Sequence, residues 1–101
     1  MSNGLAEAIA EAVTELSGTT HDSVDGTITW SRGEVPFAAL GRDGVEVLLD
    51  GPIAAAARHT PDVGPSTRGA DWVRFNPHIL DAHALDRLHA WIELAHRFAA
   101  R

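Results

Sequence analysis

The stretch TITWSRGEVPFAALGRDGVEVLLD, residues 27–50, predicts the centre of the fold. It holds three short apolar runs separated by two turn-forming segments, SRGE and GRDG. In the third run Val45, Val47 and Leu49 alternate along the chain and share one face of a strand. Glycine tolerates the positive φ of a tight turn, so Asp43-Gly44 indicates a hairpin. We therefore expect a three-stranded antiparallel meander, with strands at residues 27–31, 35–41 and 45–50.

The chain after this meander predicts a helix, a loop, a strand and a final helix. Pro52 is typical of a first helical turn, so we expect a short Ala-rich helix from residue 52 to 59. A loop rich in Pro, Gly, Ser and Thr follows, and residues 70–76 resemble a strand. Asp81 is a candidate N-cap for the last helix. The apolar stripe of that helix contains Leu85, Leu88, Trp91, Ile92, Ala95, Phe98 and Ala99.

The N-terminal segment predicts a further amphipathic helix. Leu5, Ile9 and Val13 recur at helical spacing, so we expect a helix over residues 3–17 that stops at Gly18. Residues 19–26 are interpreted as a turn-rich connection. The predicted order is α-β-β-β-α-β-α, a single α+β domain over residues 1–101. Its sheet is mainly antiparallel, has about four strands, and carries the helices on one face.

Composition restricts the classes of partner. The net charge is −6, all eight basic residues are Arg, and no two of them are adjacent. Nucleic-acid binding, which depends on clustered cations, is therefore disfavoured. The first residues lack the basic region of a signal peptide, and no apolar run approaches the ~20 residues of a membrane span. We expect a cytoplasmic protein that does not bind membranes, with a protein partner or a homodimer left open.

The sequence shows no catalytic pattern. It has no Cys, and its six His do not form an H-E-x-x-H pair. His78 and His83 lie on either side of Asp81, but a metal site there lacks a recognised ligand pattern. No Ser lies in G-x-S-x-G or S-x-x-K. We therefore assign no catalytic residue, no metal and no cofactor, and leave enzymatic activity open.

The segment GPSTRG, residues 64–69, is the best candidate for a ligand site. Hydroxyl groups and backbone amides beside an Arg can hold an anion, which singles out Ser66, Thr67 and Arg68. Arg74 follows on the neighbouring strand. The segment is not a P-loop, because it lacks the glycine spacing and the Lys of that motif. The alternative is that residues 60–69 only connect two elements.

Three segments together are similar to a known family. They are WSRGEVPFAALGRDGVEVLLD (30–50), RGADWVRFN (68–76) and LDRLHAWIELAHRFA (85–99). In this order they resemble MmcQ/YjbR-like domains, which implies an α+β fold of the CyaY-like, double-wing class. The longer polar segment before residue 27 and the AD after Gly69 depart from the family pattern. A small luciferase-like domain with a late W-V strand is a second resemblance. Neither family supplies catalytic residues, and the acidic charge argues against the DNA-binding label of the first.

Two functional hypotheses follow from these observations. The first is a non-enzymatic binding or interaction module that acts through a sheet face or through the loop at residues 60–69. The second is a protein that binds, or an enzyme that acts on, a small anion or metabolite. It would use Ser66, Thr67, Arg68 and Arg74.

Overall fold

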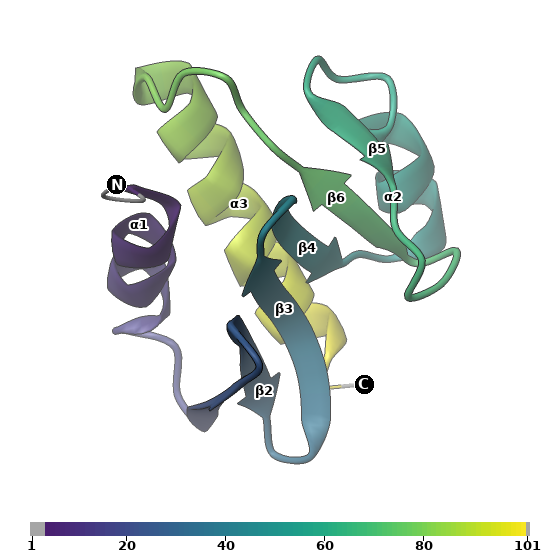
Figure 1. Ribbon diagram of the computed structural model, residues 1–101. Helices are drawn as coiled ribbons and strands as arrows, with labels where there is room; N and C mark the ends of the chain where they lie inside the picture. Colours follow the sequence, from purple (N-terminus) through teal and green to yellow (C-terminus); the bar gives the residue numbers. More distant parts are fainter. Residues whose placement is uncertain (1–3, 101) are drawn as a thin grey trace.

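The computed structural model describes residues 4–100, which form one antiparallel sheet of six strands and three helices (Figure 1). The helices are α1 (Gly4–Val13), α2 (Gly51–Ala57) and α3 (Ala82–Phe98). The strands are β1 (Thr19–Val24), β2 (Thr27–Arg32), β3 (Val35–Gly41), β4 (Gly44–Leu48), β5 (Val63–Pro65) and β6 (Trp72–Phe75). The α+β class expected from the sequence is confirmed.

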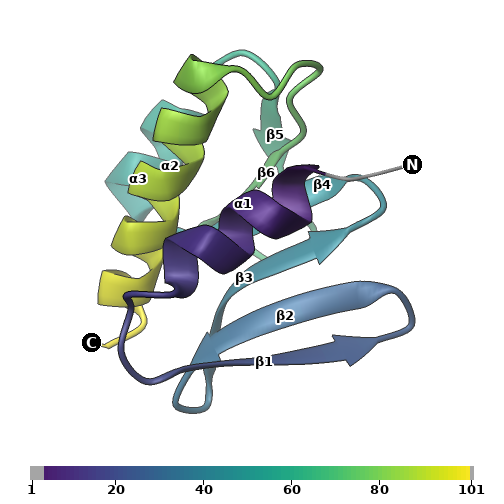
Figure 2. The same cartoon turned by 90° about the vertical axis from the view of Figure 1, so that its left-hand side faces the viewer.

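The sheet consists of a four-stranded meander extended by two further strands. Strands β1 to β4 form a continuous meander, and β6 then pairs with β4 while β5 closes the far edge, which gives the order β1-β2-β3-β4-β6-β5. The three helices lie on the same side of this sheet, so its other side is an open face (Figure 2). The meander expected for residues 27–50 is therefore confirmed, inside a larger sheet.

One continuous apolar cluster fills the space between the sheet and the helices. Val45, Val47 and Leu49 are fully buried, as their alternation predicts. Phe37 and Phe75 join them from neighbouring strands. The helices contribute Leu5, Ala8 and Ile9 from α1, Ala54 and Ala57 from α2, and Ala84, Leu88, Trp91, Ile92 and Ala95 from α3. All three helices are thus fixed by the same core.

The expectation of about four strands in the order α-β-β-β-α-β-α is wrong. Residues 19–24, interpreted as a turn-rich connection, form the edge strand β1, and five of its six residues are exposed. An edge strand that is mostly exposed to solvent on both faces does not need alternating apolar residues. Its sequence therefore lacks the alternation that predicts a strand. β5 lies within the predicted loop, where Gly64 and Pro65 argue against a strand. Pairing with a neighbouring strand makes each of these segments extended.

The helix ends differ from the predictions in detail. α1 ends at Val13, four residues before the predicted stop, and turns carry the chain on to Gly18, whose φ is +73°. The predicted start at residue 3 lies outside the described residues. Asp81 is confirmed as the N-cap of α3, because its carboxylate accepts a hydrogen bond from the Ala84 amide at 2.9 Å.

The base of the β1–β2 hairpin is held by a buried histidine that the sequence did not single out. His96 of α3 is 7% exposed. Its Nε2 lies 2.7 Å from the carbonyl oxygen of Ser17, just before β1, and therefore carries the hydrogen. Nδ1 of His96 is then free to accept a hydrogen bond from Arg32 Nη1 at 3.3 Å. Arg32 Nη1 also donates to the backbone carbonyl of His96 at 3.0 Å. The His96 side chain thus connects α3 to the base of the hairpin, at Ser17 before β1 and at Arg32 at the end of β2.

Candidate functional site

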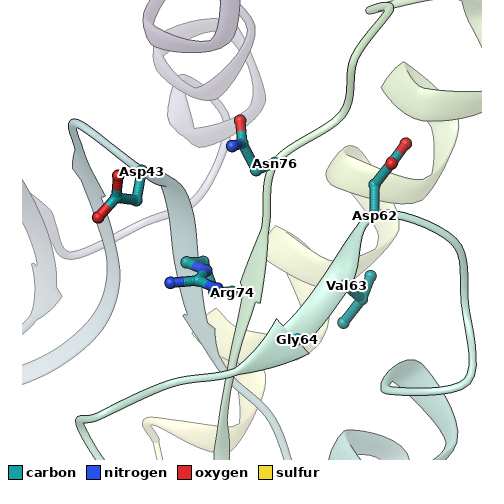
Figure 3. Close-up of a pocket in the computed structure, with 6 residues that line it drawn as sticks. All are labelled: Asp43, Asp62, Val63, Gly64, Arg74 and Asn76. Atoms are coloured by element: carbon teal, nitrogen blue, oxygen red, sulfur yellow. The ribbon is translucent and has the colours of Figure 1, made fainter.

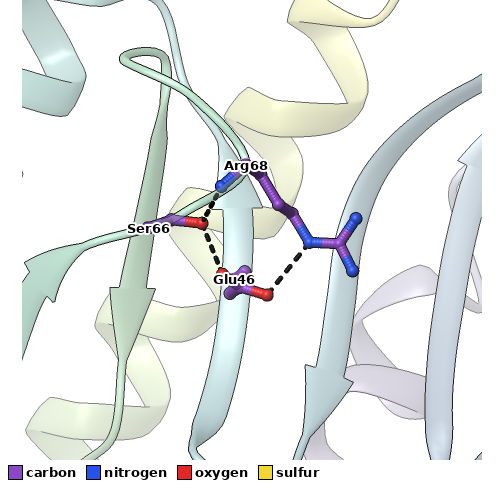
Figure 4. A network of polar contacts seen from close by, with 3 residues as sticks. All are labelled: Glu46, Ser66 and Arg68. Carbon is purple, nitrogen blue, oxygen red and sulfur yellow. Dashed lines mark hydrogen bonds and ion pairs between the residues drawn. The ribbon is translucent and has the colours of Figure 1, made fainter.

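The candidate site lies on the open face of the sheet, over β4 and β6. Glu46 and Arg74 are directly opposite each other in these two strands. Val45 and Val47 on either side of Glu46 point into the core, so the alternation of the strand turns Glu46 outward. The loop between β5 and β6 approaches this carboxylate, which brings Ser66 and Arg68 onto the same face (Figure 4).

Glu46 anchors that loop through two hydrogen bonds. Its carboxylate accepts one from the Ser66 hydroxyl and one from Arg68 Nε at 2.9 Å (Figure 4). The Ser66 oxygen in turn accepts from the Arg68 amide at 3.1 Å. The Arg68 guanidinium also lies 5.3 Å from the centre of the Trp72 ring, within range of a cation–π contact. Glu46 therefore already compensates the charge of Arg68.

Arg74 has a different environment. Two hollows meet at its side chain, one of about 270 Å³ and one of about 420 Å³. The smaller is lined by Thr27, Gly41, Arg42, Asp43, Gly44, Glu46, Thr67 and Arg74. The larger is lined by Asp43, Asp62, Val63, Gly64, Arg74 and Asn76 (Figure 3). Across residues 4–100, neither Arg74 nor Arg42 has an ion-pair partner.

Backbone geometry shapes the surroundings of Arg74. Gly64 faces Arg74 across the β5–β6 pair, and a Cβ at Gly64 would lie 3.6 Å from a terminal nitrogen of the guanidinium. The guanidinium therefore lies over the bare backbone of β5. The turn at Arg42 and Asp43 forms the opposite wall, so the smaller hollow is a polar groove between a hairpin tip and a loop.

The four residues predicted to bind a ligand lie around this one groove, in two different roles. Ser66 and Arg68 are occupied by Glu46, whereas Thr67 and Arg74 line the groove. That they bind a ligand stays a prediction. Sequence reasoning missed Arg42 and Glu46. The outward position of Glu46 in the strand pattern could have revealed it, but nothing in the sequence places Arg42 beside Arg74.

The histidines do not gather into a metal site in the described part of the chain. No group of three His, Asp or Glu side chains within residues 4–100 could hold an ion. His78 pairs instead with Asp62, with 3.2 Å between Nδ1 and the carboxylate, and Asp81 between the two histidines caps α3. The loop at residues 60–69 contains β5, so it is more than a connection, because it supplies the last strand of the sheet.

Comparison with protein-family models, with curated proteins and with solved structures finds no match. Over residues 4–100, every helix is too short or too polar to cross a bilayer. The geometry of the groove is therefore the basis for proposing a function.

Proposed function

We propose that the protein is a small binding module that holds a small anion, such as a carboxylate or a phosphate, in the polar groove on the open face. The observation that supports this is the environment of Arg74. It lies in a groove with Arg42 and Thr67, while Glu46, the carboxylate opposite it, is engaged by Ser66 and Arg68. Guanidinium groups without protein partners are good donors to carboxylates and phosphates.

The charge around the groove favours binding of an anion, although the net charge of the whole chain is negative. In the smaller hollow Arg42 and Arg74 face Asp43 and Glu46, and Glu46 is paired with Arg68, so these five groups carry one net positive charge on a chain of net charge −6. Asp62 of the larger hollow is paired with His78. One anionic group matches such an excess. A nucleic acid requires many phosphate contacts, so the acidic remainder of the surface would repel it.

Binding is a better match to these contacts than catalysis. Ser66 donates to Glu46 and accepts from the Arg68 amide, so both contacts of its hydroxyl hold the loop in place. An activated serine nucleophile also needs a position where substrate can lie, whereas Ser66 does not line the polar groove and Glu46, the carboxylate it contacts, is already paired with Arg68. We therefore assign Ser66 a structural role in the site and propose no reaction.

The test is titration of the protein with inorganic phosphate and with citrate at low salt, followed by NMR chemical shifts. We expect shifts at Thr67 and Arg74. The variant Arg74→Gln should weaken binding by about tenfold or more, since a hydrogen bond to a charged group contributes about 1.5–3 kcal/mol. The matched control is Arg97→Gln, an exposed arginine on α3. Equal binding by Arg74→Gln and wild type would exclude this site.

A further inference from the structure

A further hollow lies on the other side of the sheet, at the β1 end. It has a volume of about 310 Å³ and lies between α1 and the first two strands. Its lining is mainly apolar and consists of Ala6, Ala10, Val13, Thr14, His21, Ile28 and Trp30. The side chains of α1 on this side are small, because residues 6 and 10 are alanines. The helix therefore leaves space above Ile28 and Trp30. This apolar groove is separate from the polar groove over β4 and β6.

The apolar groove opens beside a free sheet edge. Within residues 4–100, β1 pairs only with β2, so one side of its backbone has no partner strand there (Figure 2). The Gly33 amide donates to the Gly18 carbonyl, which continues the β1–β2 ladder by one pair. Hydrogen-bonded pairs alternate along an antiparallel ladder, so the backbone groups of the even-numbered β1 residues bond to β2. The backbone groups of Thr19, His21 and Ser23 therefore point to the free edge. Such an edge is a template for an added strand.

The charge around this edge is strongly negative. Residues 4–32, from α1 to the end of β2, contain five carboxylates, at positions 7, 11, 15, 22 and 25, and one Arg, Arg32, which lies at the base of the hairpin. The rest of the chain is closer to neutral, since it carries the remaining nine carboxylates and seven arginines. Glu7 and Glu11 lie on the same side of α1 as Thr14, which lines the groove, so their carboxylates follow its rim.

We propose that the β1 edge and the apolar groove bind an extended segment of a partner protein in which apolar and basic residues alternate. The segment adds to β1 as a seventh strand. Its residues opposite His21 and Ser23 point to the helix side and enter the groove, because directly paired residues share a face. The residues between them point to the open face beside Asp22, where basic side chains meet a carboxylate.

Charge distinguishes this occupant from a second copy of the chain. Pairing of two β1 strands would bring the acidic edges of both copies together, and like charges across an interface oppose association. A basic segment instead neutralises the carboxylates of α1 and β1. This proposal concerns a different face from the anion groove and does not depend on it.

The test uses a synthetic peptide of about eight residues, the length of an ordinary strand, in which Val and Lys alternate. The control peptide has Glu in place of Lys. Fluorescence anisotropy should give binding of the Val–Lys peptide that is at least about tenfold tighter, and NMR shifts should fall on β1 and α1. Equal binding of both peptides, or shifts confined to the Arg74 groove, would overturn the proposal.

Two pairs of variants separate the backbone edge from the charge. Ser23→Pro removes one outward amide and leaves the β2 ladder intact, and it should weaken the Val–Lys peptide about three- to tenfold. Ser23→Ala retains that amide and should bind like wild type. Glu7→Gln with Glu11→Gln should also weaken binding, whereas Glu93→Gln on α3 should not.

Two results with these variants would contradict the proposal. One is unchanged peptide binding by a folded Ser23→Pro protein, with folding verified by circular dichroism. The other is dimerisation of the wild-type chain in sedimentation that Ser23→Pro abolishes, because the edge would then be occupied by a second copy.

Discussion

Two hairpins of this sheet have an Asp-Gly pair at their tips, within the turn of one and at the end of the turn in the other, and the two tips have opposite surroundings. In the β1–β2 hairpin, Asp25 and Gly26 are the turn residues, with φ of +53° and +82°, and a Cβ at Gly26 would meet nothing within 4 Å. In the β3–β4 hairpin, Gly44 has a φ of +109°, and a Cβ there would lie 2.5 Å from the Phe75 carbonyl oxygen. One tip is free in solvent, and the other is packed against a neighbouring strand.

Each hairpin is accordingly fixed at a different place. The β1–β2 hairpin is held at its base, where His96 reaches both Ser17 and Arg32. The β3–β4 hairpin is held along its length and at its tip, because β6 pairs with β4 as far as Phe75. The first arrangement leaves a sheet edge and the apolar groove exposed. The second builds a rigid wall for the polar groove. The same dipeptide thus lies at a solvent-exposed tip in one hairpin and at a packed tip in the other.

The largest expected effect comes from the packed tip. Gly44→Ala should destabilise the protein by about 3 kcal/mol or more, because the residue keeps a positive φ and its Cβ meets backbone atoms. Gly26→Ala carries only the conformational cost, which is about 1–2 kcal/mol. Urea unfolding followed by circular dichroism measures both. Similar losses for the two variants would show that the tips are not held differently.

A smaller effect is expected at the base of the first hairpin. His96→Ala should cost about 2–3 kcal/mol, since it opens a cavity, removes the partner of the Ser17 carbonyl and leaves Arg32 with only the backbone carbonyl of residue 96. Hydrogen exchange should show faster opening of β1 than of β4. His89→Ala on the same helix, a half-buried position, is the control. A uniform rise in exchange across the whole sheet would contradict a local clamp.

The smallest effect is expected in the polar loop. Glu46 and Arg68 form a partly exposed ion pair, with side-chain exposures of 23% and 34%. A double-mutant cycle of Glu46→Gln and Arg68→Gln should therefore give a coupling of about 0.5–1 kcal/mol, lower at high salt. The loss should appear as greater loop mobility in NMR relaxation, with little change in global unfolding. A coupling of several kcal/mol would mean that the loop is part of the core.

The contrast between the hairpins explains which parts of the fold were predictable. Gly44 follows a strongly apolar run, and Val45, Val47 and Leu49 after it alternate clearly, so the β3–β4 hairpin was expected from the sequence. The Asp25-Gly26 turn joins a polar strand to a partly apolar one. β1 buries little, so no pattern identified it as a strand, although the Asp-Gly signal was present.

The candidate site was predictable only in part, for a related reason. Ser66, Thr67, Arg68 and Arg74 are near one another in the sequence, so local composition could single them out as a group. Their division into loop anchors and groove lining depends on Glu46, which comes from a distant strand. The apolar groove was not foreseen at all, because α1 and the β1–β2 hairpin meet only in the folded chain.

By itself the sequence determined the class of the fold, the central meander, the N-cap of α3 and the faces that form the core. These features depend on the alternation and spacing of apolar residues, which act over a few positions. The tertiary structure alone decided the edge position of β1, the burial of His96 and the pairing of Glu46 with Arg68. Each of these depends on contacts between segments far apart in the chain, for which local patterns carry no information.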